Sequence, residues 1–126
     1  MKAVLARLAL MSAILVASPA AAQVAGPWTV SGDVGGRPFV VNCRFESHGA
    51  EFGGVCVDAS VADAKAGKAH TLTKGTVSGG QVRWTYPATF MLAKFDVNFV
   101  GALAGDRIAG TVSASGRNGA FTAVRK

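Results

Sequence analysis

The only two cysteines of the chain, Cys43 and Cys56, constrain its fold more than any other feature. Gly49-Ala50 lies midway between them, and glycine at the first position of a two-residue loop is typical of a type II′ hairpin turn. A hairpin closed on this loop pairs His48 with Glu51, and stepping back along both strands places the cysteines opposite each other. The Cα atoms of such a non-hydrogen-bonded pair lie about 4.5 Å apart, within reach of a disulfide. The sequence therefore predicts one cross-strand disulfide.

The N-terminal segment has the features of a secretory signal peptide. A basic start is followed by an apolar run over residues 4–16 and by Ala20-Ala21-Ala22, which fits a small-residue cleavage site. The apolar run is shorter than the ~20 residues that a membrane span needs, so an uncleaved anchor is the weaker alternative. We predict a signal peptide over residues 1–22 and a periplasmic or secreted domain over residues 23–126. Both compartments permit the disulfide, and two free buried thiols are the alternative.

The charges of the mature chain are sparse and mixed. Two of the 13 basic residues lie in the predicted signal peptide, which leaves 11 against 7 acidic residues. Apart from the last two residues, the basic residues stand singly along the chain, whereas nucleic-acid binding favours a clustered basic stripe. We expect no nucleic-acid partner and no membrane span in the mature chain.

Alternating apolar and polar residues are interrupted by glycine-containing turns about every twelve residues, which is typical of an all-β sandwich or barrel. Two-residue turns are predicted at 35–36, 49–50, 79–80, 104–105 and 118–119. The predicted strands are 28–34, 37–47, 51–58, 70–78, 81–86, 95–103, 106–113 and 120–125. The fold class that follows is all-β: a single eight-stranded antiparallel up-and-down barrel with one cross-strand disulfide.

The predicted registers sort the side chains into two faces. A glycine falls opposite an aromatic residue in the pairs Gly32–Phe39, Gly54–Phe45, Gly75–Trp84, Gly110–Phe99 and Gly116–Phe121, as expected for a tightly coiled barrel. The inner face is apolar and the outer face polar. An outer-membrane barrel has the reverse pattern, so we reject that class.

The export signal, the sequential strands and the start Gly26-Pro27-Trp28 resemble the calycin-type barrels of lipocalins and avidins. That resemblance implies an eight-stranded up-and-down barrel that holds a small ligand. The start at residues 25–28 also resembles that of the periplasmic inhibitors of bacterial metalloproteases, which are eight-stranded barrels with one disulfide. That second resemblance implies a protein partner, with the tail from Gln23 entering the protease.

The residues that could carry chemistry are few. His48 and His70 are the only histidines, and the bland interpretation of His48 is a solvated turn residue. His70 with Asp58 nearby is a candidate base or half of a metal site, but two ligands are fewer than zinc requires. No nucleophile elbow or phosphate-binding loop is present. We predict no enzyme activity, no metal site and no cofactor.

The connections 59–69 and 87–93 share one end of the predicted barrel, where a pocket is expected to open. The predicted ligand-binding residues there are Asp58, Tyr86, Phe90 and Met91. One helical turn is predicted within 59–69 from a capping-box pattern. The apolar residues of 87–93 are expected to be covered by the barrel, a ligand or a partner protein. Alternation directs Arg37 and His70 outward.

We therefore expect an exported barrel that binds a small apolar or amphipathic ligand at this end. One alternative is a protein-binding barrel, such as a periplasmic protease inhibitor. Another is a structural envelope protein with a filled core.

Overall fold

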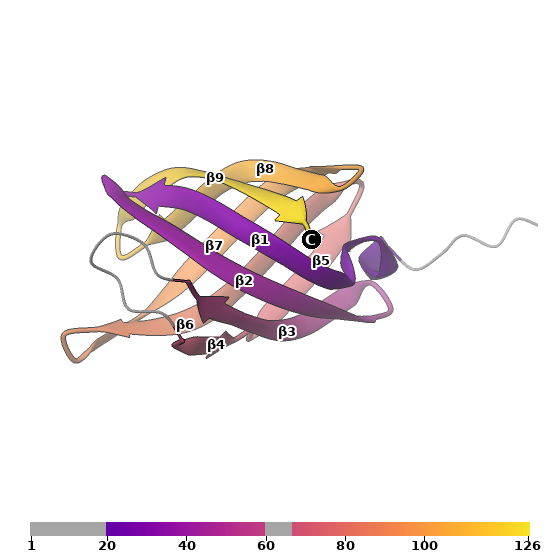
Figure 1. Ribbon diagram of the computed structural model, residues 1–126. Coiled ribbons are helices and arrows are strands. Elements are labelled where there is room, and N and C mark those ends of the chain that lie inside the picture. Colours follow the sequence, from indigo (N-terminus) through magenta and orange to yellow (C-terminus); the bar gives the residue numbers. More distant parts are fainter. Residues whose placement is uncertain (1–19, 60–66) are drawn as a thin grey trace, which may run out of the picture.

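The computed structural model describes residues 20–59 and 67–126 and shows a closed antiparallel β-barrel (Figure 1). A short 3-10 helix, η2 (Ala20–Val24), precedes the strands. The strands are β1 (Gly26–Val34), β2 (Arg37–His48), β3 (Glu51–Asp58), β4 (Ala69–Thr71), β5 (Lys74–Ser78), β6 (Gln81–Phe90), β7 (Ala93–Ala104), β8 (Arg107–Ala114) and β9 (Arg117–Arg125).

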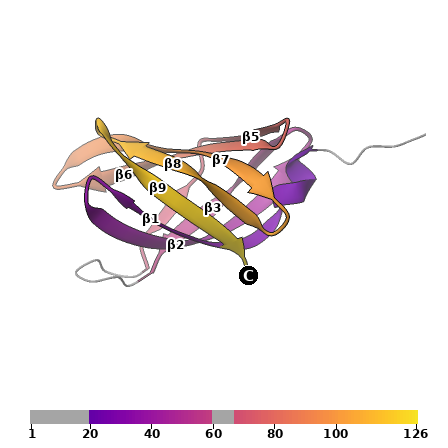
Figure 2. The same ribbon diagram turned by 90° about the horizontal axis from the view of Figure 1, so that it is seen from above.

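The order of the strands in the sheet is β2-β1-β9-β8-β7-β6-β5-β3-β4, and a further pairing of β2 with β3 closes it into a ring. Viewed from above, β9 crosses the molecule beside β1 and β8 (Figure 2). β4 and β5 both pair with β3 and share one position of the ring. The barrel therefore has eight strand positions, and the predicted fold class is confirmed.

β2 and β3 form the predicted hairpin in the predicted register. Gly49 opens the turn with a φ of 73°, as a type II′ turn requires. His48 pairs with Glu51, and Cys43 pairs with Cys56 with 4.0 Å between their Cα atoms. The two sulfur atoms are bonded, so the cross-strand disulfide is confirmed.

Two of the predicted turns are wrong. β7 and β8 are joined by Gly105-Asp106, not by residues 104–105, because the positive φ of 62° at Gly105 suits the first position of the turn. β8 and β9 are joined by Ser115-Gly116, not by residues 118–119. Gly119 instead allows β9 to approach β1, since a Cβ there would collide with the backbone of Asp33.

The glycine–aromatic pairs follow from these registers. The structure confirms Gly32–Phe39, Gly54–Phe45 and Gly75–Trp84. The pairs Gly110–Phe99 and Gly116–Phe121 are wrong, because each depends on one of the two wrongly predicted turns. Gly110 pairs with Gly101 on one side and with Phe121 on the other.

Two predicted segments have a different local structure. The predicted strand 70–78 is broken after Thr71 into β4 and β5. The predicted connection 87–93 is the outer part of the β6–β7 hairpin, in which Pro87 pairs with Asp96 and Met91-Leu92 makes the turn. The helical turn predicted within 59–69 falls on residues 60–66, outside the described residues.

Aromatic side chains fill the interior. Trp84 lies at the centre, stacked on Phe99 with 4.7 Å between ring centroids. Phe45 and Phe121 contact the same indole at 5.2 and 5.4 Å. The predicted inner face is confirmed, because all of its residues are buried or packed against the buried cluster. These residues are Trp28, Val30, Phe39, Val41, Cys43, Phe45, Phe52, Cys56, Val82, Trp84, Tyr86, Phe95, Val97, Phe99, Ile108 and Val112.

η2 closes the end of the barrel from which β1 starts, and we call this the closed end. Ala21 and Val24 of η2 are fully buried, and the indole Nε1 of Trp28 donates a hydrogen bond of 2.9 Å to the carbonyl oxygen of Val24. Residues 1–19 of the predicted signal peptide lie outside the described residues, while residues 20–22 belong to η2. The domain boundary after Ala22 stays a prediction.

Candidate functional site at the open end

Three polar side chains from three strands meet inside the barrel at the end opposite η2, which we call the open end. Asp58 ends β3, His70 lies on β4 and Tyr86 lies on β6. His70 Nε2 is 3.0 Å from Asp58 Oδ1, and the imidazole stacks on the Tyr86 ring with 4.7 Å between centroids. His70 and Tyr86 are buried, whereas Asp58 remains partly exposed. We call these three residues the polar trio.

The chemistry of the polar trio suits recognition of a polar group. Burial, with a smaller contribution from the Asp58 carboxylate, raises the pKa of the Tyr86 phenol well above its ordinary value. The phenol therefore stays protonated and keeps a hydrogen to donate. Since the Asp58 carboxylate only accepts hydrogen bonds, His70 Nε2 donates to it.

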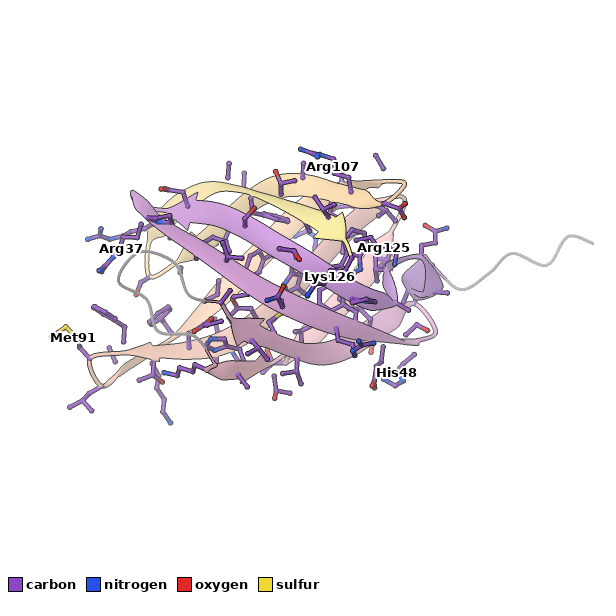
Figure 3. The ribbon with its side chains drawn as sticks, viewed as in Figure 1. Arg37, His48, Met91, Arg107, Arg125 and Lys126 are labelled. Atoms are coloured by element: carbon purple, nitrogen blue, oxygen red, sulfur yellow. A yellow bond between two sulfur atoms is a disulfide. The ribbon has the colours of Figure 1, made fainter. Side chains whose placement is uncertain are left out.

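The outer part of the β6–β7 hairpin extends the open end away from the barrel body (Figure 1). Phe90 ends β6 with 52% of its surface exposed, and Met91 and Leu92 in the turn are 82% and 97% exposed. The guanidinium of Arg37, the first residue of β2, lies over the Phe90 ring at 5.2 Å. We call residues 90–92 the apolar tip, and Figure 3 shows Met91 at the end of the hairpin that points away from η2.

The structure brings together only some of the predicted ligand-binding residues. Asp58 and Tyr86 meet, as members of the polar trio. Met91 lies five residues beyond Tyr86, about 16 Å along the strand, and is not part of that cluster. Phe90 occupies an intermediate place, because it follows Tyr86 on the same side of β6 but lies at the end of the strand.

One residue of the site was predicted to lie on the wrong face. Alternation through an unbroken strand 70–78 directs His70 outward, yet its side chain is 8% exposed and faces Asp58 and Tyr86. The break between β4 and β5 shifts the alternation by one residue, because Leu72 and Gly75 are both buried although they are three residues apart. The outward direction predicted for Arg37 agrees with its exposure.

Basic residues lie at the open end near the apolar tip, and of these only Arg37 was predicted from the sequence to lie at this end. Lys94 pairs with Thr89 directly below the turn, and Lys68 Nζ donates a hydrogen bond of 3.4 Å to the carbonyl oxygen of Thr89. Arg37 and Arg117 begin the strands that follow two other turns of the open end. These four residues, the basic collar, are far apart in the sequence. The signal that identifies them is position: Arg37, Lys94 and Arg117 each follow a turn of the open end by one or two residues, and Lys68 is the last residue of the connection between β3 and β4.

The outer wall of the barrel carries shallow hollows. One of about 270 Å³ lies over β2 and β3, and one of about 380 Å³ lies over β5, β6 and β7. The aromatic cluster occupies the space inside. Within the described ranges, no three His, Cys, Asp or Glu side chains are grouped closely enough to hold a metal ion.

The comparisons with known proteins leave the family open. A scan against protein-family models finds none that matches the sequence, and a search of the curated proteins finds no match either. No helix in the described part of the chain is long and apolar enough to cross a membrane. The architecture is consistent with a calycin-like barrel, and the likeness is one of fold, not of demonstrated lipocalin or avidin descent.

Proposed function

We propose that this protein is an exported binding module, not an enzyme, which holds a small apolar or amphipathic molecule at the open end. The observation that carries the proposal is a continuous inner face on the β6–β7 hairpin. This face leads from the half-exposed Phe90 through the partly buried Ala88 and Phe95 to the polar trio. It combines an apolar surface with a few convergent polar groups, as small-molecule sites do.

The filled interior determines how such a ligand binds. The centre of the barrel is occupied by Trp84 and its aromatic neighbours, so a ligand cannot lie along the barrel axis. It would bind in a shallow position instead, with its apolar part along the hairpin and its polar group at Tyr86 and His70. A shallow site favours small or flat molecules over long chains.

Export is supported by two separate features. The disulfide between Cys43 and Cys56 is typical of proteins in an oxidising compartment. The N-terminal segment has the order of a signal peptide, which directs a chain to the periplasm or out of the cell.

Titration with an apolar fluorescent probe tests the ligand site. We expect saturable binding to the wild-type protein and weaker binding to the double variant Phe90→Ser with Met91→Ser. Both side chains are exposed, so the variant should keep its fold, which circular dichroism would verify. The matched control is Val57→Ser with Val124→Ser, which removes two exposed apolar side chains from the outer wall of the barrel.

A second arm tests the polar trio. Tyr86→Phe deletes one hydroxyl and should weaken an amphipathic probe about three- to tenfold, the usual value of one neutral hydrogen bond. The same change should leave a purely hydrocarbon probe unaffected. If the wild type binds no probe, or if the Phe90/Met91 variant and the control bind equally well, the open end is not a ligand site, and a protein-binding barrel becomes the better hypothesis.

A further inference from the structure

The apolar tip is unusual in both its exposure and its backbone. Met91 and Leu92 have φ values of 50° and 72°, in the left-handed region that bulky side chains rarely adopt. Turns of this kind ordinarily carry Asn-Gly, which adopts positive φ at little cost. Here two large apolar residues occupy both positions and face water. Neither the stability nor the solubility of the barrel gains from this choice, which points to a role in binding.

Among the described residues, the charged side chains that contact the apolar tip or lie within one residue pair of it are all basic. Arg37, Lys68 and Lys94 lie within one residue pair of it or contact it directly. All three are exposed, as is Arg117 on the neighbouring β8–β9 turn. Along the hairpin itself, the first carboxylate is Asp96, which pairs with Pro87 in the fourth residue pair from the turn. A partner for this surface must therefore be apolar beneath a negatively charged layer.

We propose that the open end docks on an anionic phospholipid surface, with the apolar tip inserted among the headgroups and the basic collar on the lipid phosphates. Leu92 lies two residues beyond Lys94, which is about 7 Å along an extended chain. That distance matches the ~5–10 Å depth to which interfacial segments bury their apolar side. The long lysine and arginine side chains can keep their charges at the phosphate level while the tip lies deeper.

The dimensions favour a lipid surface over a protein partner. A stable protein interface takes about 800 Å² from each partner and some 20–30 residues. The apolar tip has three residues and projects from the barrel, so a flat partner would contact little else (Figure 1). A bilayer needs only a few inserted side chains together with electrostatic attraction, because several basic residues add to the binding. This inference does not depend on the proposed ligand site.

The variant Leu92→Trp gives a local test of insertion. The two native tryptophans are buried, at 0% and 1% exposure, whereas position 92 is 97% exposed. We expect the emission of the new tryptophan to shift to shorter wavelength when vesicles of phosphatidylglycerol mixed with phosphatidylcholine are added. Pure phosphatidylcholine vesicles should give a much smaller shift, and added salt should reverse the shift on the anionic vesicles.

Two further variants separate the apolar and electrostatic contributions in a vesicle co-sedimentation assay. Met91→Asn with Leu92→Gly installs an ordinary turn sequence, so the fold should persist while binding is lost. Lys68→Gln with Lys94→Gln should weaken partitioning about fivefold for each charge removed. The matched control, Arg107→Gln with Lys126→Gln, removes the same charge away from the apolar tip and should bind as the wild type does (Figure 3).

Three results would overturn the proposal. One is the absence of an emission shift at position 92 with anionic vesicles at low ionic strength. Another is unchanged sedimentation of the Met91→Asn, Leu92→Gly variant. The third is an equal loss of binding in the collar variant and its control, which would mean that net charge alone attracts the protein. Each result leaves the apolar tip to a protein partner, and none of them affects the probe-binding test.

Discussion

At the level of single residues, the tight coiling of this barrel depends on glycines whose missing Cβ makes room for backbone. A Cβ on Gly110 would collide with the carbonyl oxygen of Val100 and with Gly101, both on β7. At Gly32 and Gly75 the obstacles likewise include backbone atoms of the adjacent strand. Close approach of the strands, more than space for an aromatic ring, is therefore the reason for glycine at these positions.

Substitution of Gly110 tests this explanation. Gly110→Ala should destabilise the barrel by about 1–3 kcal/mol, the usual cost of overpacking, because the rigid backbone of β7 must move. The control is Gly53→Ala on β3, where an added Cβ would meet nothing within 4 Å and φ is not positive. That change should be neutral or slightly stabilising. Urea unfolding of both variants measures the difference, and equal stabilities would show that β7 and β8 are not so close.

At the level of elements, a hairpin was predicted correctly where the glycine occupies the turn position that the prediction assigned to it. Gly49 and Gly79 each open the predicted turn, and the registers that follow are correct. Two glycines misled the prediction. Gly105 occupies the first position of its turn instead of the second, and Gly119 lies inside β9. Both errors shift the pairing by an even number of residues, so the predicted inner face remained correct.

The candidate site was predicted only in part, because it depends on a local break in a strand. Asp58 and Tyr86 follow the alternation of continuous strands and were placed together correctly. His70 was placed outward because the interruption at Leu72-Thr73 has no glycine or proline to indicate it. The backbone amides of those two residues donate to different strands, Leu72 to the carbonyl oxygen of Gly54 on β3 and Thr73 to that of Thr85 on β6. Apart from Arg37, the members of the basic collar were missed because only the closed barrel brings them to one end.

Arg125 on β9 stabilises the closed end. Arg125 lies over the Trp28 indole at 4.4 Å and donates hydrogen bonds to the carbonyl oxygens of Gln23 at 2.6 Å and Ala25 at 2.8 Å. It also pairs with Asp106 at 2.8 Å, but that carboxylate is 80% exposed, so the ion pair contributes little. The guanidinium therefore connects the last strand to η2 and to the start of β1.

Removal of this guanidinium should weaken the closed end. We expect Arg125→Ala to lower the free energy of unfolding by about 1–3 kcal/mol, through the lost charged hydrogen bonds and the lost stacking. Arg125→Lys should recover little, because an ammonium lacks the planar fork that reaches both carbonyls. Lys126→Ala is the neighbouring control and should be neutral. A lysine variant as stable as the wild type would contradict a role for the fork geometry.

At the level of the whole molecule, the two ends of the barrel are built differently. The closed end is packed by η2 and fastened by Arg125, and the aromatic cluster fills the centre. The open end carries the polar trio, the apolar tip and the basic collar. The groups for which we propose binding roles are thus concentrated at one end of a rigid body, which holds them in a constant arrangement.

The disulfide secures this body where the ring of strands closes between β2 and β3. Cys43 and Cys56 are separated by 13 positions in the sequence and are almost fully buried. For a loop of this length, the chain-entropy account gives a stabilisation of about 3 kcal/mol.

Reduction should therefore lower the midpoint of thermal unfolding while the filled aromatic core keeps the transition cooperative. Calorimetry of the protein in the absence and in the presence of a reductant would measure the change in midpoint. Cys43→Ala with Cys56→Ala serves as a second route to the same state. Equal midpoints with and without reductant would show that hydrogen bonding and packing alone hold β2 to β3.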